Sequence, residues 1–117
     1  MKQHSRPLWR GLLTELVAFS LLVASIVLLW RDNVWLFLVV LVEVLVVLVF
    51  WHDRGDLCFF GGVAVLGSVA EVVFVHFGVW HYANPTLLGI PLWFPLAFGV
   101  AALILGRLIR TLTTLWA

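Results

Sequence analysis

Residues 68–95 carry the side chains best suited to chemistry in a chain that is otherwise strongly apolar. Glu71 and His76 interrupt an apolar run, and His81 and Tyr82 open a proline-containing turn that follows it. An ionisable group at membrane depth is costly, so it is by default a functional-site hypothesis. We therefore predict a ligand-binding site in this stretch, formed by Glu71, Ser68, His76, Trp80 and Tyr82.

Glu71 is the predicted polar anchor of that site. Steps of three and four residues place it on one helix face with small residues, namely Gly61, Ala64, Ser68, Val75 and Gly78. Small residues let membrane helices approach closely, so this face is expected to point at protein rather than lipid. A buried acid needs a partner or a proton. A ligand contact, a proton site and a structural hydrogen bond all remain open for Glu71. His76 lies about 140° around the helix from it, so the two make a poor metal pair.

Two further acids lie within apolar runs and are possible proton sites. Glu43 has only aliphatic neighbours on its own segment, so any partner must come from another helix or subunit. Glu15 lies near the start of the first run, where it can reach the interface or pair with Arg10. No metal site is expected, because Arg54 interrupts the acidic turn at residues 52–56 and the spacing fits no standard ligand set.

The elements that must position these residues are transmembrane helices. Of the 117 residues, 64% are apolar and 11% are charged, whereas about a quarter of a soluble domain is charged. Apolar runs of spanning length predict helices at about residues 12–30, 34–51, 57–80 and 92–107. We therefore predict an all-α integral membrane four-helix bundle that forms a single domain over residues 1–117.

The positions of the basic residues predict the orientation. Four spans put both termini on one side, together with Lys2, Arg6, Arg10, Arg54, Arg107 and Arg110, and leave only Arg31 opposite. The positive-inside rule then places both termini in the cytoplasm. The expected location is the cytoplasmic membrane of a prokaryote or the endoplasmic reticulum of a eukaryote. A net charge of +1 gives no reason to expect a nucleic-acid partner.

The last two predicted spans resemble the insulin-induced gene family of sterol-responsive membrane proteins. The resemblance is carried without gaps by Gly78, Val79, Tyr82, Pro85, Leu88, Ile90, Trp93, Pro95 and Phe98. Asp32-Asn33, the turn at residues 51–54 and Gly106-Arg107 extend it over about residues 32–107. The sequence departs from that family at Thr86, where the family has an acid that serves partner binding. It also departs at Glu43 and Glu71, where the family has uncharged residues.

The resemblance implies a helical bundle that accommodates a lipid or isoprenoid between its helices, as that six-span family does with oxysterol. The predicted function is accordingly non-catalytic: lipid or isoprenoid binding, with regulation or scaffolding of another membrane protein. Catalytic motifs such as HExxH and CxxC are absent from the sequence, so an enzyme is disfavoured and no cofactor is expected. The alternatives are a small proton-coupled transporter acting as a homodimer, and an accessory subunit of a larger membrane complex.

Overall fold

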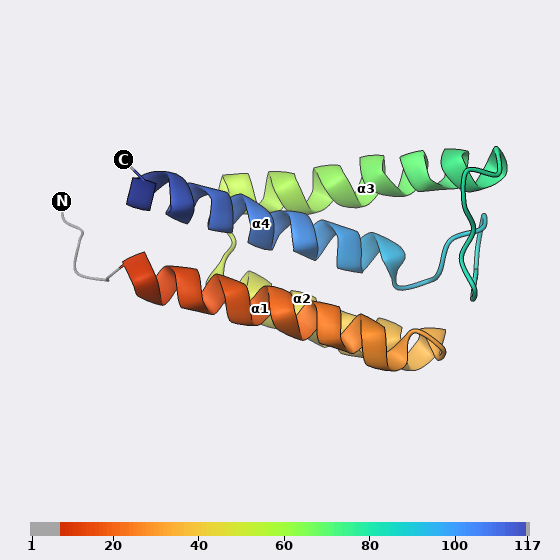
Figure 1. Cartoon of the computed structure of the whole chain (residues 1–117), viewed down its shortest axis with the longest axis horizontal. Coiled ribbons are helices and arrows are strands. Elements are labelled where there is room, and N and C mark those ends of the chain that lie inside the picture. Colours follow the sequence, from red (N-terminus) through yellow and green to blue (C-terminus); the bar gives the residue numbers. More distant parts are fainter. Residues whose placement is uncertain (1–7, 117) are drawn as a thin grey trace.

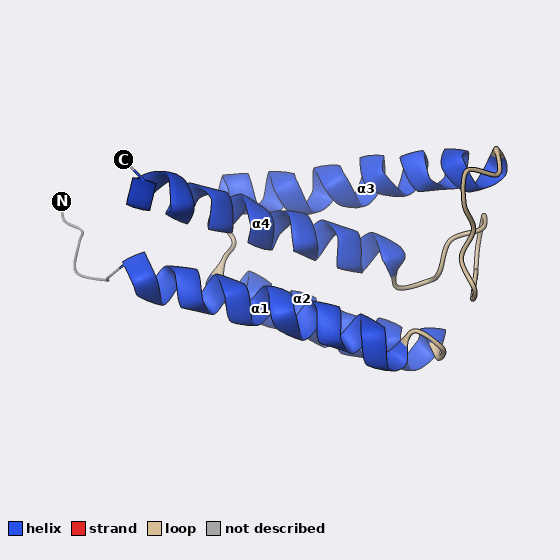
Figure 2. Ribbon diagram, viewed as in Figure 1, coloured by secondary structure: helices blue, strands red, loops and turns tan. Residues whose placement is uncertain are grey.

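The computed structural model describes residues 8–116, which form four helices joined by short connections (Figures 1 and 2). The helices are α1 (Leu8–Leu29), α2 (Asn33–Phe50), α3 (Arg54–His76) and α4 (Phe94–Trp116). All four are long and apolar enough to cross a membrane. The predicted all-α fold with four helices of this kind is therefore confirmed.

The tight turn between α1 and α2 is fixed by side-chain hydrogen bonds. Asp32 caps α2 by accepting a hydrogen bond from Trp35 N at 3.1 Å. Asn33 then ties the turn to the loop before α4, because its Nδ2 donates to Asn84 O at 2.7 Å and to Thr86 Oγ1 at 2.8 Å. These bonds join the two connections that lie at the same end of the bundle (Figure 1).

The connection between α3 and α4 reverses the chain through left-handed backbone conformations. Gly78 has φ +75° and follows the last turn of α3, a position that commonly ends a helix. Leu88 and Gly89 adopt φ 54° and 86° in a tight turn closed by hydrogen bonds between Leu87 and Ile90. A side chain on Gly89 would also lie 2.5 Å from Val75 Cγ1. Glycine is therefore required here for both conformation and space.

Helix α4 is the central element of the fold. It packs against α1, α2 and α3, whereas α3 contacts α4 alone among the helices of the described chain. Figure 1 shows α3 and the α1–α2 pair on opposite sides of α4. The most deeply buried apolar side chains accordingly come from α2 and α4: Leu36, Val40, Val100, Leu103 and Ile104.

Small residues let α3 and α4 approach closely. A Cβ on Gly99 would lie 2.7 Å from Phe60 O and 3.0 Å from Ala64 Cβ. A Cβ on Gly67 would meet the ring of Phe98 at 2.1 Å. At these glycines the backbone of one helix packs directly against residues of the other, as small residues permit in membrane bundles. Gly61, by contrast, faces open space, with no atom within 4 Å of an added Cβ.

The helix bounds differ from the predicted spans at α3 and α4. Helix α3 ends at His76 rather than near Trp80, because the chain turns at Gly78. Helix α4 continues past Arg107 to Trp116. The first part of α1 and the last part of α4 consequently extend beyond the turn between α2 and α3, at the same end of the bundle (Figure 1).

The close contact at Gly99 predicts a pair of matched effects. Gly99→Ala should lower the free energy of unfolding by about 1–3 kcal/mol, because the rigid backbone carbonyl of Phe60 cannot yield to the new methyl group. Gly61→Ala should leave stability unchanged or raise it by up to about 1 kcal/mol through helix propensity. Reversible unfolding in detergent, followed by circular dichroism, measures both. Equal effects of the two substitutions would contradict the packing described here.

Candidate functional site

Three of the predicted site residues come together at the end of α3. Glu71 is buried, with 8% of its surface exposed. The indole Nε1 of Trp80 donates to Glu71 Oε1 at 3.1 Å, and the hydroxyl of Tyr82 donates to the same oxygen. Trp80 also packs edge-on against Phe74, with ring centroids 5.3 Å apart. The Glu71 carboxylate therefore holds the chain reversal after Gly78 against its own helix.

The other two predicted residues do not join this hydrogen-bond group. Ser68 lies one turn before Glu71, and its Oγ is buried without a partner among the described residues. His76 is exposed, and its ring packs edge-on against Phe77 at 5.2 Å. The predicted set is thus divided into a hydrogen-bonded group of Glu71, Trp80 and Tyr82, and two residues that form no hydrogen bond with that carboxylate.

Tyr82 is fixed in its neutral, donating form. Burial raises the pKa of the Tyr82 phenol, and the hydrogen bond and charge of Glu71 raise it further. Its ring packs edge-on against Phe94 on α4, with centroids 5.8 Å apart. Tyr82 therefore links the Glu71 carboxylate to the aromatic start of α4.

An apolar groove of about 300 Å³ lies between α1 and α4, beside Tyr82. Its walls are formed by apolar and aromatic side chains: Phe19, Leu22, Val23, Ile26, Tyr82, Trp93, Phe94, Ala97, Phe98 and Ala101. Glu71 is not among these lining residues; it reaches the groove only through Tyr82. A groove of this size and lining suits an apolar chain rather than a polar ligand.

Glu43 lies inside the group formed by α1, α2 and α4. Ser25 on α1 donates to Glu43 Oε2 at 2.7 Å, which is the cross-helix partner that its own aliphatic segment lacks. The other oxygen, Oε1, is buried without a partner among the described residues. Glu43 also lines an apolar cavity of about 210 Å³. One of its oxygens thus remains free to accept a proton or a donor.

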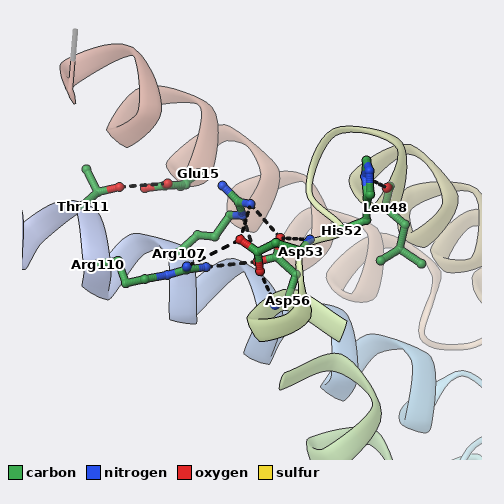
Figure 3. Close-up of polar contacts among 8 residues, drawn as sticks. All are labelled: Glu15, Leu48, His52, Asp53, Asp56, Arg107, Arg110 and Thr111. Carbon is green, nitrogen blue, oxygen red and sulfur yellow. Dashed lines mark hydrogen bonds and ion pairs between the residues drawn. The ribbon is translucent and has the colours of Figure 1, made fainter. Parts of the chain in front are cut away.

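Glu15 is paired across the bundle with α4. Its side chain is 4% exposed, and Thr111 Oγ1 donates to Glu15 Oε2 at 2.9 Å (Figure 3). Its Oε1 has no partner within residues 8–116. No described salt bridge joins Glu15 to Arg10, the partner considered from the sequence.

An ion-pair cluster joins the start of α3 to α4 (Figure 3). Asp56 is fully buried and forms a capping box with Asp53 at the helix start. Arg107 donates two hydrogen bonds to Asp56, from Nε to Oδ1 at 2.9 Å and from Nη2 to Oδ2 at 2.6 Å. Arg110 adds a hydrogen bond to Oδ1 at 3.1 Å. The Arg107 guanidinium also lies over the ring of Trp51 at 5.2 Å.

The sequence-based interpretation considered this turn only as a possible metal site, and it did not pair the turn with the two arginines. Opposite charges separated by about 50 positions give no periodic signal, so the pairing could not be inferred from spacing. One local signal was present, since Asp53 and Asp56 have the spacing of a capping box. That signal predicts where a helix starts, but it does not reveal which cations neutralise the two carboxylates.

Comparison with protein-family models, with curated proteins and with solved structures finds no match for this chain. The resemblance to the insulin-induced gene family therefore stays a prediction from the residues quoted above.

The ion-pair cluster predicts unequal roles for its two arginines. Arg107→Gln should lower the free energy of unfolding by about 3–5 kcal/mol, because it leaves the buried Asp56 carboxylate without its main partner. Arg110→Gln should cost about 1 kcal/mol or less, because that side chain is 53% exposed. Unfolding of both variants in the same detergent checks the ratio. A larger loss for Arg110→Gln would refute this assignment.

Proposed function

We propose that this protein is a membrane-embedded, non-catalytic helical bundle that binds the apolar chain of a lipid or isoprenoid. The binding site is the groove between α1 and α4 beside Tyr82. The observation that carries the proposal is the lining of this groove, which consists of apolar and aromatic side chains.

Membrane embedding is supported by the outer surface of the helices. Large apolar side chains such as Leu28, Phe50 and Leu66 are more than 70% exposed, which costs free energy in water but not in lipid. The basic residues support an orientation with both termini in the cytoplasm. Arg10, Arg107 and Arg110 lie in the half of the bundle where α1 begins and α4 ends, and Arg31 follows the other end of α1.

Glu71 supports lipid binding indirectly. By accepting from Trp80 and Tyr82 it satisfies both aromatic donors and turns the Tyr82 ring toward Phe94 and the groove. In this proposal Glu71 is a positioning residue, and the ligand meets Tyr82 and the apolar walls rather than the carboxylate. Ser68 and His76 have no direct part in this form of the site.

Filling the groove tests the proposal. Ala101→Phe places a ring where the chain would lie, so bound lipid or isoprenoid counted by native mass spectrometry should fall at least about tenfold. Ala24→Phe is the matched control, because Ala24 is exposed and does not line the groove. Retained occupancy in folded Ala101→Phe, or an equal loss in Ala24→Phe, would refute the groove as the binding site.

A second candidate function, proton-coupled transport by a homodimer, is favoured by one specific observation. Glu15 and Glu43 each keep one buried carboxylate oxygen without a partner among residues 8–116. Ser25, the partner of Glu43, is about 15 Å along α1 from Glu15 at the standard helical rise. The apolar cavity lined by Ala18 and Leu21 occupies part of the distance between Glu15 and Ser25.

Transport and lipid binding differ in their response to Glu43→Gln. A transporter should lose pH-driven substrate uptake into liposomes by about 100-fold or more, since a glutamine amide does not ionise near neutral pH and cannot carry a proton. Glu71→Gln serves as the control, because Glu71 lies outside the α1–α2–α4 interior. Absence of pH-driven uptake in the wild-type protein, across cationic and anionic substrates, would exclude this second candidate.

A further inference from the structure

A polar pocket lies between the extended ends of α1 and α4, apart from the apolar groove. Its volume is about 370 Å³. The polar groups on its wall come from Arg10, Thr14 and Glu15 on α1 and from Arg107 and Thr111 on α4. Trp51, at the end of α2, completes the wall. Its lining residues place the pocket toward the end of the bundle where α1 begins and α4 ends.

Glu15 gives this pocket an unsatisfied acceptor. Its side chain is 96% buried, and Oε2 is occupied by the Thr111 hydroxyl while Oε1 has no partner among the described residues. A buried acceptor without a donor destabilises the folded chain. Glu15 belongs to the pocket wall, but Oε1 is itself covered, so a ligand in the pocket can supply the missing donor only when the side chains over this oxygen move aside.

Two hydroxyls beside Glu15 are also acceptors rather than donors. Thr14 Oγ1 gives its hydrogen to Arg10 O at 2.7 Å, and Thr111 Oγ1 gives its hydrogen to Glu15. The lone pairs of both oxygens remain available. Together with Glu15 Oε1 they offer three acceptors, which is the number that a primary ammonium group with three N–H donors requires.

The cations on the same wall call for an anion next to that ammonium. No carboxylate within residues 8–116 lies within 4.0 Å of the Arg10 guanidinium, which packs over the Trp9 ring at 5.7 Å. Arg107 holds its aspartates through Nε and Nη2, and Nη1 takes no part in those bonds. Guanidinium groups with free N–H donors are well suited to phosphate oxygens.

We propose that this pocket binds a phosphoethanolamine group, with the ammonium on Glu15, Thr14 and Thr111 and the phosphate on Arg10 and Arg107. The lipid source of this group is the headgroup of phosphatidylethanolamine. Choline lacks N–H donors and glycerol lacks the positive charge, so neither satisfies Glu15 in the same way. The inference rests on the membrane embedding proposed above, but it concerns headgroup selection and not the apolar groove.

The test is a titration of the full-length chain, in detergent, with lipids that share the same acyl chains. Native mass spectrometry should give phosphatidylethanolamine a Kd at least about tenfold lower than phosphatidylcholine or phosphatidylglycerol. Glu15→Gln should reduce this preference to about twofold or less, because the amide carries no charge to attract the ammonium. Thr111→Val should weaken the preference too, and Thr113→Val, whose side chain does not line the pocket, should keep it.

Equal affinities of the wild-type chain for the three lipids would overturn the proposal, as would full preference in folded Glu15→Gln. Water-soluble glycerophosphoethanolamine distinguishes the two sources of the ligand. Competition as strong as that of the lipid would support a free metabolite, and competition at least about 100-fold weaker would support a lipid headgroup. Ala101→Phe separates the two sites. Loss of binding in the apolar groove with the headgroup preference intact would support this inference. Loss of the headgroup preference with binding in the groove intact would contradict it and leave only the groove proposal.

Discussion

The contact between the buried Asp56 carboxylate and Arg107 determines where α3 can lie. Asp56 is fully buried at the start of α3, and Arg107 satisfies both of its oxygens from the middle of α4. Removing such a carboxylate from water is costly unless donors replace the lost hydration. Because α3 contacts no other helix of the described chain, this pairing and the close approach at Gly99 set its position.

The other acids within the helices are subject to the same constraint, and each receives its hydrogen-bond donors from a different element. Glu71 receives donors from the loop after its own helix, and Glu15 receives one from Thr111 on α4. Glu43 receives one from Ser25 on α1. A buried carboxylate with both oxygens satisfied, such as Asp56, is structural. One with a free oxygen, such as Glu15 or Glu43, can still take a ligand or a proton.

The interface between α1 and α4 combines two environments that suit an amphiphile. On α1, the groove beside Tyr82 is lined by Phe19, Leu22, Val23 and Ile26. The polar pocket is lined by Arg10, Thr14 and Glu15 among the polar residues of the same helix. Helix α4 contributes to both, since its early residues line the groove and its late residues line the pocket. The polar pocket exists because α4 continues beyond Arg107 to Trp116.

The amino-acid sequence by itself determined the four apolar helices, because apolar runs of spanning length separated by short polar turns leave few other solutions. It also drew attention to Glu71, Glu43 and Glu15, because acids are rare in such runs. It could not assign their partners. Trp80 and Tyr82 reach Glu71 only after the left-handed turn at Gly78, and Ser25 reaches Glu43 across a helix interface. Tertiary structure alone decided which carboxylate oxygens are satisfied, because a donor's position depends on packing between residues distant in the chain.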